Sequence, residues 1–244
     1  MEEERLDKII MQRELFTTRA RCEQVIEEFG VLVNGKLVFK PGKKFPVDAE
    51  IELIAEEIPW VSRGALKLIR AIENWDVDFK GKVVLDIGAS TGGFTEVALD
   101  RGATKVFAID VGKDQLHEKL KDNPKVISFE KTHVRELTHN QITEPIDICV
   151  IDVSFISIEK VFPFIQGFLK SGAEVIALIK PQFQVGKENI GKNGIVKNKG
   201  LYPTVLYNVR MNATESNFTY VGHTDSPILG GDGNKEFLMF LKKN

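Results

Sequence analysis

Cysteine is scarce in this 244-residue sequence, and the spacings that bind metal ions are missing. The two cysteines, Cys22 and Cys149, lie far apart. Isolated cysteines favour free thiols in a reducing compartment over a disulfide framework. The four histidines show no metal-ligand spacing with these cysteines. We therefore expect no metal site.

Long apolar runs and an export signal are also missing. No window reaches the ~18 uninterrupted apolar residues of a membrane span, because charged residues cut the most apolar stretch, around 146–169. The N-terminal order Met-Glu-Glu-Glu-Arg differs from the basic-then-apolar order of a secretory signal. We expect a cytoplasmic protein with no membrane partner.

An excess of charge of one sign is absent too, since the net charge is −2. Whether the chain binds nucleic acid then depends on local clusters of positive charge. One glycine-rich segment is basic, with Glu188 as its single acidic residue. Its lysines are Lys187, Lys192, Lys197 and Lys199. We expect a mobile cationic loop there. Its charge alone is equally consistent with phosphate contact and with plain solvation.

The most informative stretch that is present runs from Val83 to Phe94. An apolar run predicts a buried strand, and a glycine-rich turn lets the backbone approach a ligand closely. Ligands of open α/β sheets bind outside the carboxyl ends of the strands. The spacing G-x-S-x-G-G differs from the G-x-G-x-x-G of nicotinamide and flavin folds. It resembles the first motif of S-adenosylmethionine-dependent methyltransferases.

From residue 62 onward, apolar strand patterns alternate with helical ones, which favours a largely parallel sheet covered by helices on both faces. A helix is expected from Ser62 to Asn74, and another over 200–213. Strands are expected at 83–87, 105–110, 126–129, 146–152, 173–180, 218–224 and 236–241.

Residues 1–55 form a separate α-then-β pattern, and 56–61 are predicted to be the linker to a domain at 62–244. We expect a helix over 5–12, a second helix capped by Thr17 or Thr18, a hairpin over 31–39 and a strand over 49–55.

This N-terminal pattern resembles the ribosomal S-four type (αL) RNA-binding module, a small α+β domain. The matching segments are 5–8, 18–22 and 30–36. The resemblance implies RNA contacts by Arg5, Arg19, Arg21 and Lys36. The alternative is a small protein-docking domain with solvated arginines.

Charged residues follow several predicted strands. Asp110 ends the second strand, where a carboxylate can accept hydrogen bonds from a ribose diol. Asp152 and Lys180 end the fourth and fifth strands, and buried charges require partners. The predicted cofactor-binding residues are Asp86, Gly88, Ala89, Ser90, Gly92, Gly93, Phe94, Asp110, Val111, Thr132, His133 and Asp152.

From residue 5 to residue 241 the chain resembles the TlyA group of bacterial proteins, often labelled haemolysins, whose catalytic domain is of the FtsJ type. The motifs Asp-Val-Ser-Phe and Lys-Pro-Gln-Phe carry this resemblance. It implies a Rossmann-like α/β fold with a mostly parallel seven-stranded sheet whose last strand is antiparallel. It also implies a catalytic tetrad in this chain order: Lys67, Asp152, Lys180 and Glu236.

The resemblance further implies S-adenosylmethionine as cofactor and the 2'-hydroxyl of cytidine in ribosomal RNA as target. The family pattern has Asn where His133 stands and Glu where Gln184 stands, which bears on cofactor fit and loop contacts. The RNA-binding candidates are Arg5, Arg19, Arg21, Lys36, Arg63, Lys187, Lys192 and Lys197.

The tetrad suits the chemistry of a ribose hydroxyl, which must lose its proton as it attacks a sulfonium methyl group. We expect Lys180 to receive the proton or stabilise the alkoxide, and Asp152 to orient it. Lys67 and Glu236 would complete the charge pattern and hold the hydroxyl. Positioning the reactants in line supplies much of the acceleration, and no metal is needed.

Three other functions compete with this one. A membrane-damaging protein is disfavoured by the missing spans and the missing cationic amphipathic helix. A nicotinamide oxidoreductase is disfavoured by the glycine spacing. A non-catalytic RNA-binding or ribosome-assembly factor is disfavoured by the intact tetrad. Binding of S-adenosylmethionine tests the first two, and methyl transfer to ribosomal subunits tests the third.

Overall fold

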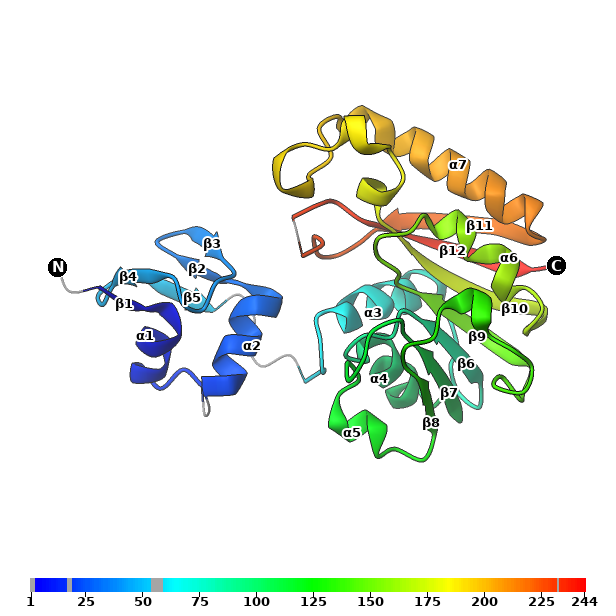
Figure 1. The fold of residues 1–244 in the computed structure, drawn as a ribbon, viewed down its shortest axis with the longest axis horizontal. Helices are drawn as coiled ribbons and strands as arrows, with labels where there is room; N and C mark the ends of the chain where they lie inside the picture. Colours follow the sequence, from blue (N-terminus) through cyan, green and yellow to red (C-terminus); the bar gives the residue numbers. More distant parts are fainter. Residues whose placement is uncertain (1–2, 17–18, 54–58, 232) are drawn as a thin grey trace. The chain divides into compact units, whose positions relative to one another are not determined.

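The computed structural model describes residues 3–16, 19–53, 59–231 and 233–244 (Figure 1). The chain divides into two units, Met1–Arg63 and Gly64–Asn244, which we describe separately. The predicted helix caps Thr17 and Thr18, residues 56–58 of the predicted linker and residues 54–55 of the predicted strand lie outside the described residues.

The N-terminal unit packs two helices against a small sheet. Its helices are α1 (Leu6–Gln12) and α2 (Arg19–Phe29). Its three-stranded antiparallel sheet has the order β3 (Lys36–Val38), β2 (Val31–Val33), β5 (Ile51–Leu53), and a separate pair joins β1 (Glu3–Arg5) to β4 (Lys44–Pro46). One cluster of buried side chains, including Leu6, Ile26 and Val31, joins helices and sheet.

The predicted hairpin turn is present in this unit. Asn34 and Gly35 connect β2 to β3 with φ angles of 49° and 71°. Two consecutive left-handed residues suit the twist of a hairpin, and Asn-Gly is the pair that adopts them most easily. The turn therefore presents the exposed Lys36 at the start of β3.

The C-terminal unit is built on a seven-stranded sheet of order β11-β12-β10-β9-β6-β7-β8. Strands β6 to β10 run parallel, and the last strand in sequence, β12, is antiparallel to both of its neighbours. This confirms the predicted fold class. The strands are β6 (Val83–Ile87), β7 (Lys105–Ile109), β8 (Val126–Phe129), β9 (Ile146–Ile151), β10 (Leu169–Ile179), β11 (Phe218–Asp225) and β12 (Phe237–Lys243).

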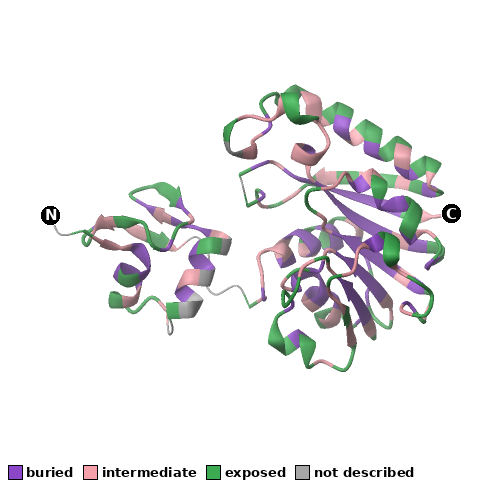
Figure 2. Cartoon of the chain, viewed as in Figure 1, coloured by how far each residue is buried: buried purple, intermediate pink, exposed green. Residues whose placement is uncertain are grey.

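Most of these strands are buried along their length, as Figure 2 shows. Continuous apolar strands are expected where both faces of a parallel sheet are covered. The helices of this unit are α3 (Gly64–Trp75), α4 (Gly93–Asp100), α5 (Glu118–Lys121), α6 (Phe162–Ile165) and α7 (Tyr202–Glu215).

One expectation for this unit needs correction. The connection between β8 and β9 contains only a short 3-10 turn, Val134–Glu136, in place of the helix expected from strict alternation. The basic segment, whose mobility stays a prediction, is tied to the rest of the domain at Asn234. Asn234, 2% exposed, accepts from the amide of Val196 and donates to the carbonyl of Gly194, so it anchors this segment.

Candidate active site

A cavity of about 260 Å³ opens at the carboxyl ends of β6, β7 and β9. Seven of the twelve predicted cofactor residues line it, namely Gly88, Ser90, Asp110, Val111, Thr132, His133 and Asp152. Its remaining wall is largely apolar and includes Ile87, Val134 and Ile156. The other five, Asp86, Ala89, Gly92, Gly93 and Phe94, do not line the cavity and belong to the structure around it.

The glycines of the turn are required by protein packing. Gly88 has a φ of 85°, and a Cβ there would lie 2.3 Å from the carbonyl oxygen of Asp152. Gly92 has a φ of 98°, and its Cβ would lie 2.2 Å from a methyl group of Leu120. The glycines thus bring the turn after β6 against the end of β9 and against α5. Gly88 also lines the cavity, and close approach of its backbone to a ligand stays a prediction.

Asp110 is fixed at the cavity by backbone donors. The amide of Ser90 donates to its Oδ2 at 2.8 Å, and the amide of Gly112 donates to its Oδ1 at 2.6 Å. Each carboxylate oxygen can accept more than one hydrogen bond. The side chain therefore has capacity left for a ligand diol while its orientation is set.

His133 has a structural task as well as a place in the cavity wall. Its Nδ1 accepts from the amide of Arg135 at 3.1 Å, and its own amide donates to Glu136. This capping box begins the 3-10 turn after β8. Because this hydrogen bond holds its ring in place, His133 is suited to lining a pocket.

Asp86 is fully buried next to the cavity and lies within β6. The hydroxyl of Thr95 donates to its Oδ2 at 2.6 Å. Burial raises the pKa of Asp86 to about 7, and the nearby carboxylates of Asp152 and Asp110 add to the effect. This aspartate therefore holds its proton more tightly than an exposed carboxyl group does.

The four predicted catalytic residues come together from four elements. Lys67 lies on the buried face of α3, Asp152 follows β9, Lys180 follows β10 and Glu236 precedes β12. Because β9, β10 and β12 are neighbours in the sheet, their ends meet at one edge. The structure brings all four side chains into one chain of contacts.

The contacts alternate acid and base. Nζ of Lys180 lies 2.6 Å from Oδ1 of Asp152, whose Oδ2 lies 3.9 Å from Nζ of Lys67. Nζ of Lys67 also lies 2.6 Å from Oε2 of Glu236, and we treat this contact, like that of Lys180 with Asp152, as an ion pair. Two ammonium and two carboxylate groups balance their formal charge.

The four side chains of this chain of contacts differ in how far they are exposed. The side chain of Glu236 is 2% exposed and that of Lys67 is 7%, whereas those of Lys180 and Asp152 reach 12% and 21%. Buried ions are stable only when paired. Lys67 and Glu236 therefore form the inner end of the chain, and Lys180 and Asp152 form the end that a substrate can reach.

Among the cavity residues to which the sequence analysis gave no role are Ser154 and Phe155. Nζ of Lys180 donates to Oγ of Ser154 at 2.7 Å. Phe155 is 91% exposed, has a φ of 65° and lies with its ring centroid 5.4 Å from that of Phe183. Both belong to the run Asp-Val-Ser-Phe. An exposed ring beside the cavity offers a surface on which a nucleobase can stack.

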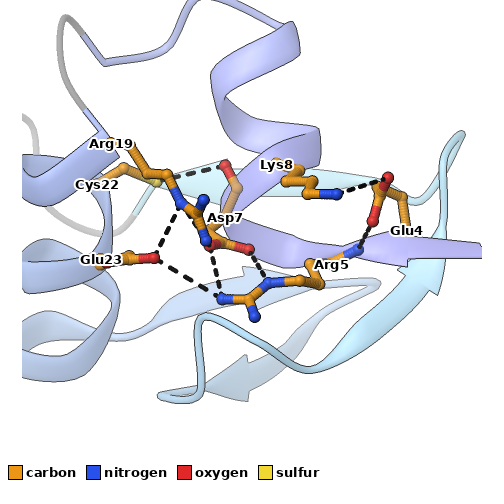
Figure 3. A network of polar contacts seen from close by, with 7 residues as sticks. All are labelled: Glu4, Arg5, Asp7, Lys8, Arg19, Cys22 and Glu23. Atoms are coloured by element: carbon orange, nitrogen blue, oxygen red, sulfur yellow. Dashed lines mark hydrogen bonds and ion pairs between the residues drawn. The ribbon is translucent and has the colours of Figure 1, made fainter.

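Two predicted RNA-binding arginines are engaged inside the N-terminal unit. Arg5 and Arg19 both point at the fully buried Asp7 (Figure 3). Arg5 donates twice to Asp7 at 2.9 Å, and Arg19 donates at 3.1 and 2.9 Å while also pairing with Glu23. Their side chains stay 38% and 52% exposed. The pairing therefore fixes the guanidinium groups and leaves part of each accessible.

The other predicted RNA-binding residues differ in their surroundings. Lys36, Lys187 and Lys192 are exposed, and Lys197 donates to the carbonyl of Glu188 at 3.2 Å. Arg63 lies over the ring of Phe39 at 6.0 Å. The side chain of Arg21 lies outside the described residues.

Within the described ranges, no group of three or more His, Cys, Asp or Glu residues could hold a metal ion. Nor is any helix there long and apolar enough to cross a membrane.

Known proteins provide three close comparisons. The "16S/23S rRNA (cytidine-2'-O)-methyltransferase TlyA" of Mycobacterium tuberculosis is 38% identical over 239 residues, which are 98% of this chain and 89% of that protein. Hemolysin A of Brachyspira hyodysenteriae is 36% identical over 235 residues, 96% of this chain and 98% of that protein. A solved structure of a candidate hemolysin from Streptococcus thermophilus has a TM-score of 0.78 at 39% identity, covering 100% of this chain and 90% of that one.

Family patterns match both units. The pattern of the FtsJ-like methyltransferases matches residues 60–243, and that of the S4 domain matches residues 4–51. These matches confirm the family resemblance predicted from the sequence. The chain belongs to the TlyA family of FtsJ-like methyltransferases and carries an N-terminal S4 domain.

Proposed function

We propose that this protein transfers the methyl group of S-adenosylmethionine to the ribose 2'-hydroxyl of a cytidine in ribosomal RNA. The observation that carries the proposal is the chain of contacts Lys180–Asp152–Lys67–Glu236. It reaches the cavity through Asp152, which lines the wall. The printed name of the M. tuberculosis relative supports the choice of cytidine and ribosomal RNA.

The cavity fits the cofactor by its chemistry. When bound, S-adenosylmethionine supplies a methyl group on a positively charged sulfur, which keeps the electron pair of the broken C–S bond as the ribose oxygen bonds to the carbon. We assign Asp110 to the cofactor's ribose diol, because its carboxylate is already held by two backbone amides. Thr132, His133 and the apolar Val134 would enclose the adenine.

The proton of the attacking hydroxyl is assigned to Lys180. Its nitrogen, which accepts the proton as a neutral amine, lies between Asp152 and Ser154, both of which line the cavity. Asp152 orients Lys180, and the inner pair Lys67–Glu236 holds Asp152 in place through the contact at 3.9 Å. General-base assistance and a fixed in-line approach are the two sources of acceleration available to these residues.

RNA binding is assigned to the S4 domain and to the basic segment. Arg19 and Lys36 offer exposed cationic groups on the first, and Lys187 and Lys192 offer them on the second. Contacts to phosphates supply most of the affinity of such surfaces and position the RNA. Selection of the nucleotide is left to the cavity and to the exposed Phe155.

The test is Lys180→Ala with purified protein, S-adenosylmethionine and ribosomal subunits that lack the modification. We expect methyl transfer to fall about 10³-fold, measured by mass mapping of ribosomal RNA fragments. Affinity for S-adenosylmethionine, measured by calorimetry, should stay within about threefold, because Lys180 does not line the cavity.

Lys170→Ala is the matched control. Nζ of Lys170 also lies 2.6 Å from an aspartate, Asp147, but at the start of β10 and away from the cavity. Its rate should equal that of the wild type. Wild-type turnover in Lys180→Ala, or a methyl group found on the base instead of the ribose, would overturn the proposal.

A further inference from the structure

Ser154 is the residue at the tetrad that no part of the mechanism above requires. It lies two residues after Asp152 and follows β9, while Lys180 follows the neighbouring strand β10. Its hydroxyl accepts a hydrogen bond from Nζ of Lys180 at 2.7 Å. The side chain is exposed and lines the cavity. It is therefore beside both the proposed proton acceptor and the space for the reactants.

We infer that Ser154 is a positioning residue that fixes the direction in which the Lys180 amine receives the proton of the ribose hydroxyl. This inference rests on the proposed function of Lys180. Ser154 contacts that side chain and takes up no proton itself.

The argument is the geometry of a tetrahedral nitrogen. Apart from its bond to Cε, Nζ of Lys180 has three directions. Ser154 accepts a hydrogen bond along one of them, and Oδ1 of Asp152 lies 2.6 Å away as an ion-pair partner toward which a second N–H can turn. A neutral amine that donates one N–H to each oxygen keeps its lone pair in the third direction. Without the Ser154 hydroxyl, the amine can turn about the Cε–Nζ bond, and its lone pair can then point in either of the two directions that Asp152 does not take.

The local backbone holds Ser154 in this place. Phe155, the next residue, has a φ of 65°, which only a minority of residues other than glycine adopt. The ring of Phe155 contacts that of Phe183, three residues after Lys180. The segments after β9 and β10 are thus joined by the Ser154–Lys180 hydrogen bond and by the two rings. Further contacts between them are those of Asp152 with Lys180 and of Ser157 with Gln184.

The test is Ser154→Ala in the full-length protein, with methyl transfer to ribosomal subunits as the readout. We expect kcat to fall about tenfold, from the lost hydrogen bond and the lost orientation. KM for the subunits and the calorimetric affinity for S-adenosylmethionine should stay within twofold. A merely structural role would change these binding parameters as well.

Two further variants make the result decisive. Ser154→Thr keeps the hydroxyl and should return kcat to within about twofold of the wild type. Ser157→Ala removes the same atom three residues later, where the hydroxyl bonds to Glu159 and Gln184 instead, and should leave kcat unchanged.

Failure of this inference is distinguishable from failure of the proposed function. Wild-type kcat in Ser154→Ala, or no recovery in Ser154→Thr, overturns the role of Ser154 when Lys180→Ala is inactive. An active Lys180→Ala overturns the proposed function itself.

Discussion

Two buried aspartates, one in each unit, have opposite electrostatic surroundings. Asp7 in the S4 domain and Asp86 in the methyltransferase domain are both 0% exposed. Asp7 receives the guanidinium groups of Arg5 and Arg19. Asp86 receives a hydroxyl from Thr95, and among the described residues its Oδ1 has no hydrogen-bond partner.

The difference appears in the pKa of each group. Burial raises the pKa of Asp86 to about 7. Burial also acts to raise the pKa of Asp7, but the hydrogen bonds from Arg5 and Arg19 outweigh it and hold this pKa well below its usual range. Burial therefore does not decide charge by itself, because the nearest cation determines which form is stable.

The largest effect on the pH dependence of stability is expected from replacing Asp86. A raised pKa means that the folded state binds the proton more tightly than the unfolded chain does. Relative to Asp86→Asn, the wild type should lose stability as the pH rises from about 4 to 7, by at most about 4 kcal/mol. The measurement is urea unfolding followed by the fluorescence of Trp75, which stacks on Phe240 in the same domain.

The exposed Asp122 provides the control for this experiment. Asp122→Asn should leave the pH dependence of the wild type unchanged. If Asp86→Asn shows the same pH dependence as the wild type, Asp86 is ionised in the folded state and the contrast between the two aspartates is wrong.

The paired aspartate should give a smaller effect with the opposite sign. A lowered pKa means that Asp7 stabilises the fold fully above pH 3.8, its ordinary value, and that this contribution disappears as the pH falls further. Because both arginines are partly exposed, we expect Asp7→Asn to cost about 1–2 kcal/mol. Hydrogen exchange of the amides in α1 and α2 measures this loss, which should be constant between pH 5 and 8.

The smallest expected effect comes from removing one exposed cation of the S4 domain, either the solvent-exposed Lys36 or Arg19, which is held by Asp7. Lys36→Ala should weaken RNA binding by about 1 kcal/mol and reduce the slope of log affinity against log salt by about one. Stability should not change, since Lys36 is an exposed side chain at the hairpin. Arg19→Ala should reduce affinity and stability together because it also pairs with Asp7.

Lys125→Ala, an exposed lysine of the other domain, is the reference for this pair. Unchanged affinity and salt slope in both Lys36→Ala and Arg19→Ala would identify the S4 domain as a protein-docking unit.

The sequence predicted the parts of the site that follow from chain order. Apolar runs that end in Asp152 and Lys180 predict strand ends, and the parallel sheet brings these ends to one edge. The meeting of Asp152 and Lys180 is therefore a consequence of topology. Lys67 and Glu236, by contrast, are assigned to the tetrad only through the resemblance to the FtsJ type.

Other parts depend on contacts that no local pattern encodes. The hydrogen bond from Lys180 to Ser154 requires particular side-chain rotamers and the left-handed backbone at Phe155. The anchoring of the basic segment requires Asn234, which lies far along the chain. Likewise, nothing in the spacing of Arg5 and Arg19 shows that both reach one buried carboxylate.

The close approach of Gly88 to the carbonyl of Asp152 has a practical consequence for engineering. Even one methyl group at position 88 would clash with the backbone of Asp152, one of the two acids of the tetrad. Attempts to reshape this wall for enlarged cofactor analogues should therefore begin at Val111 or Ile156, because a change at Gly88 would alter donor recognition and proton handling together.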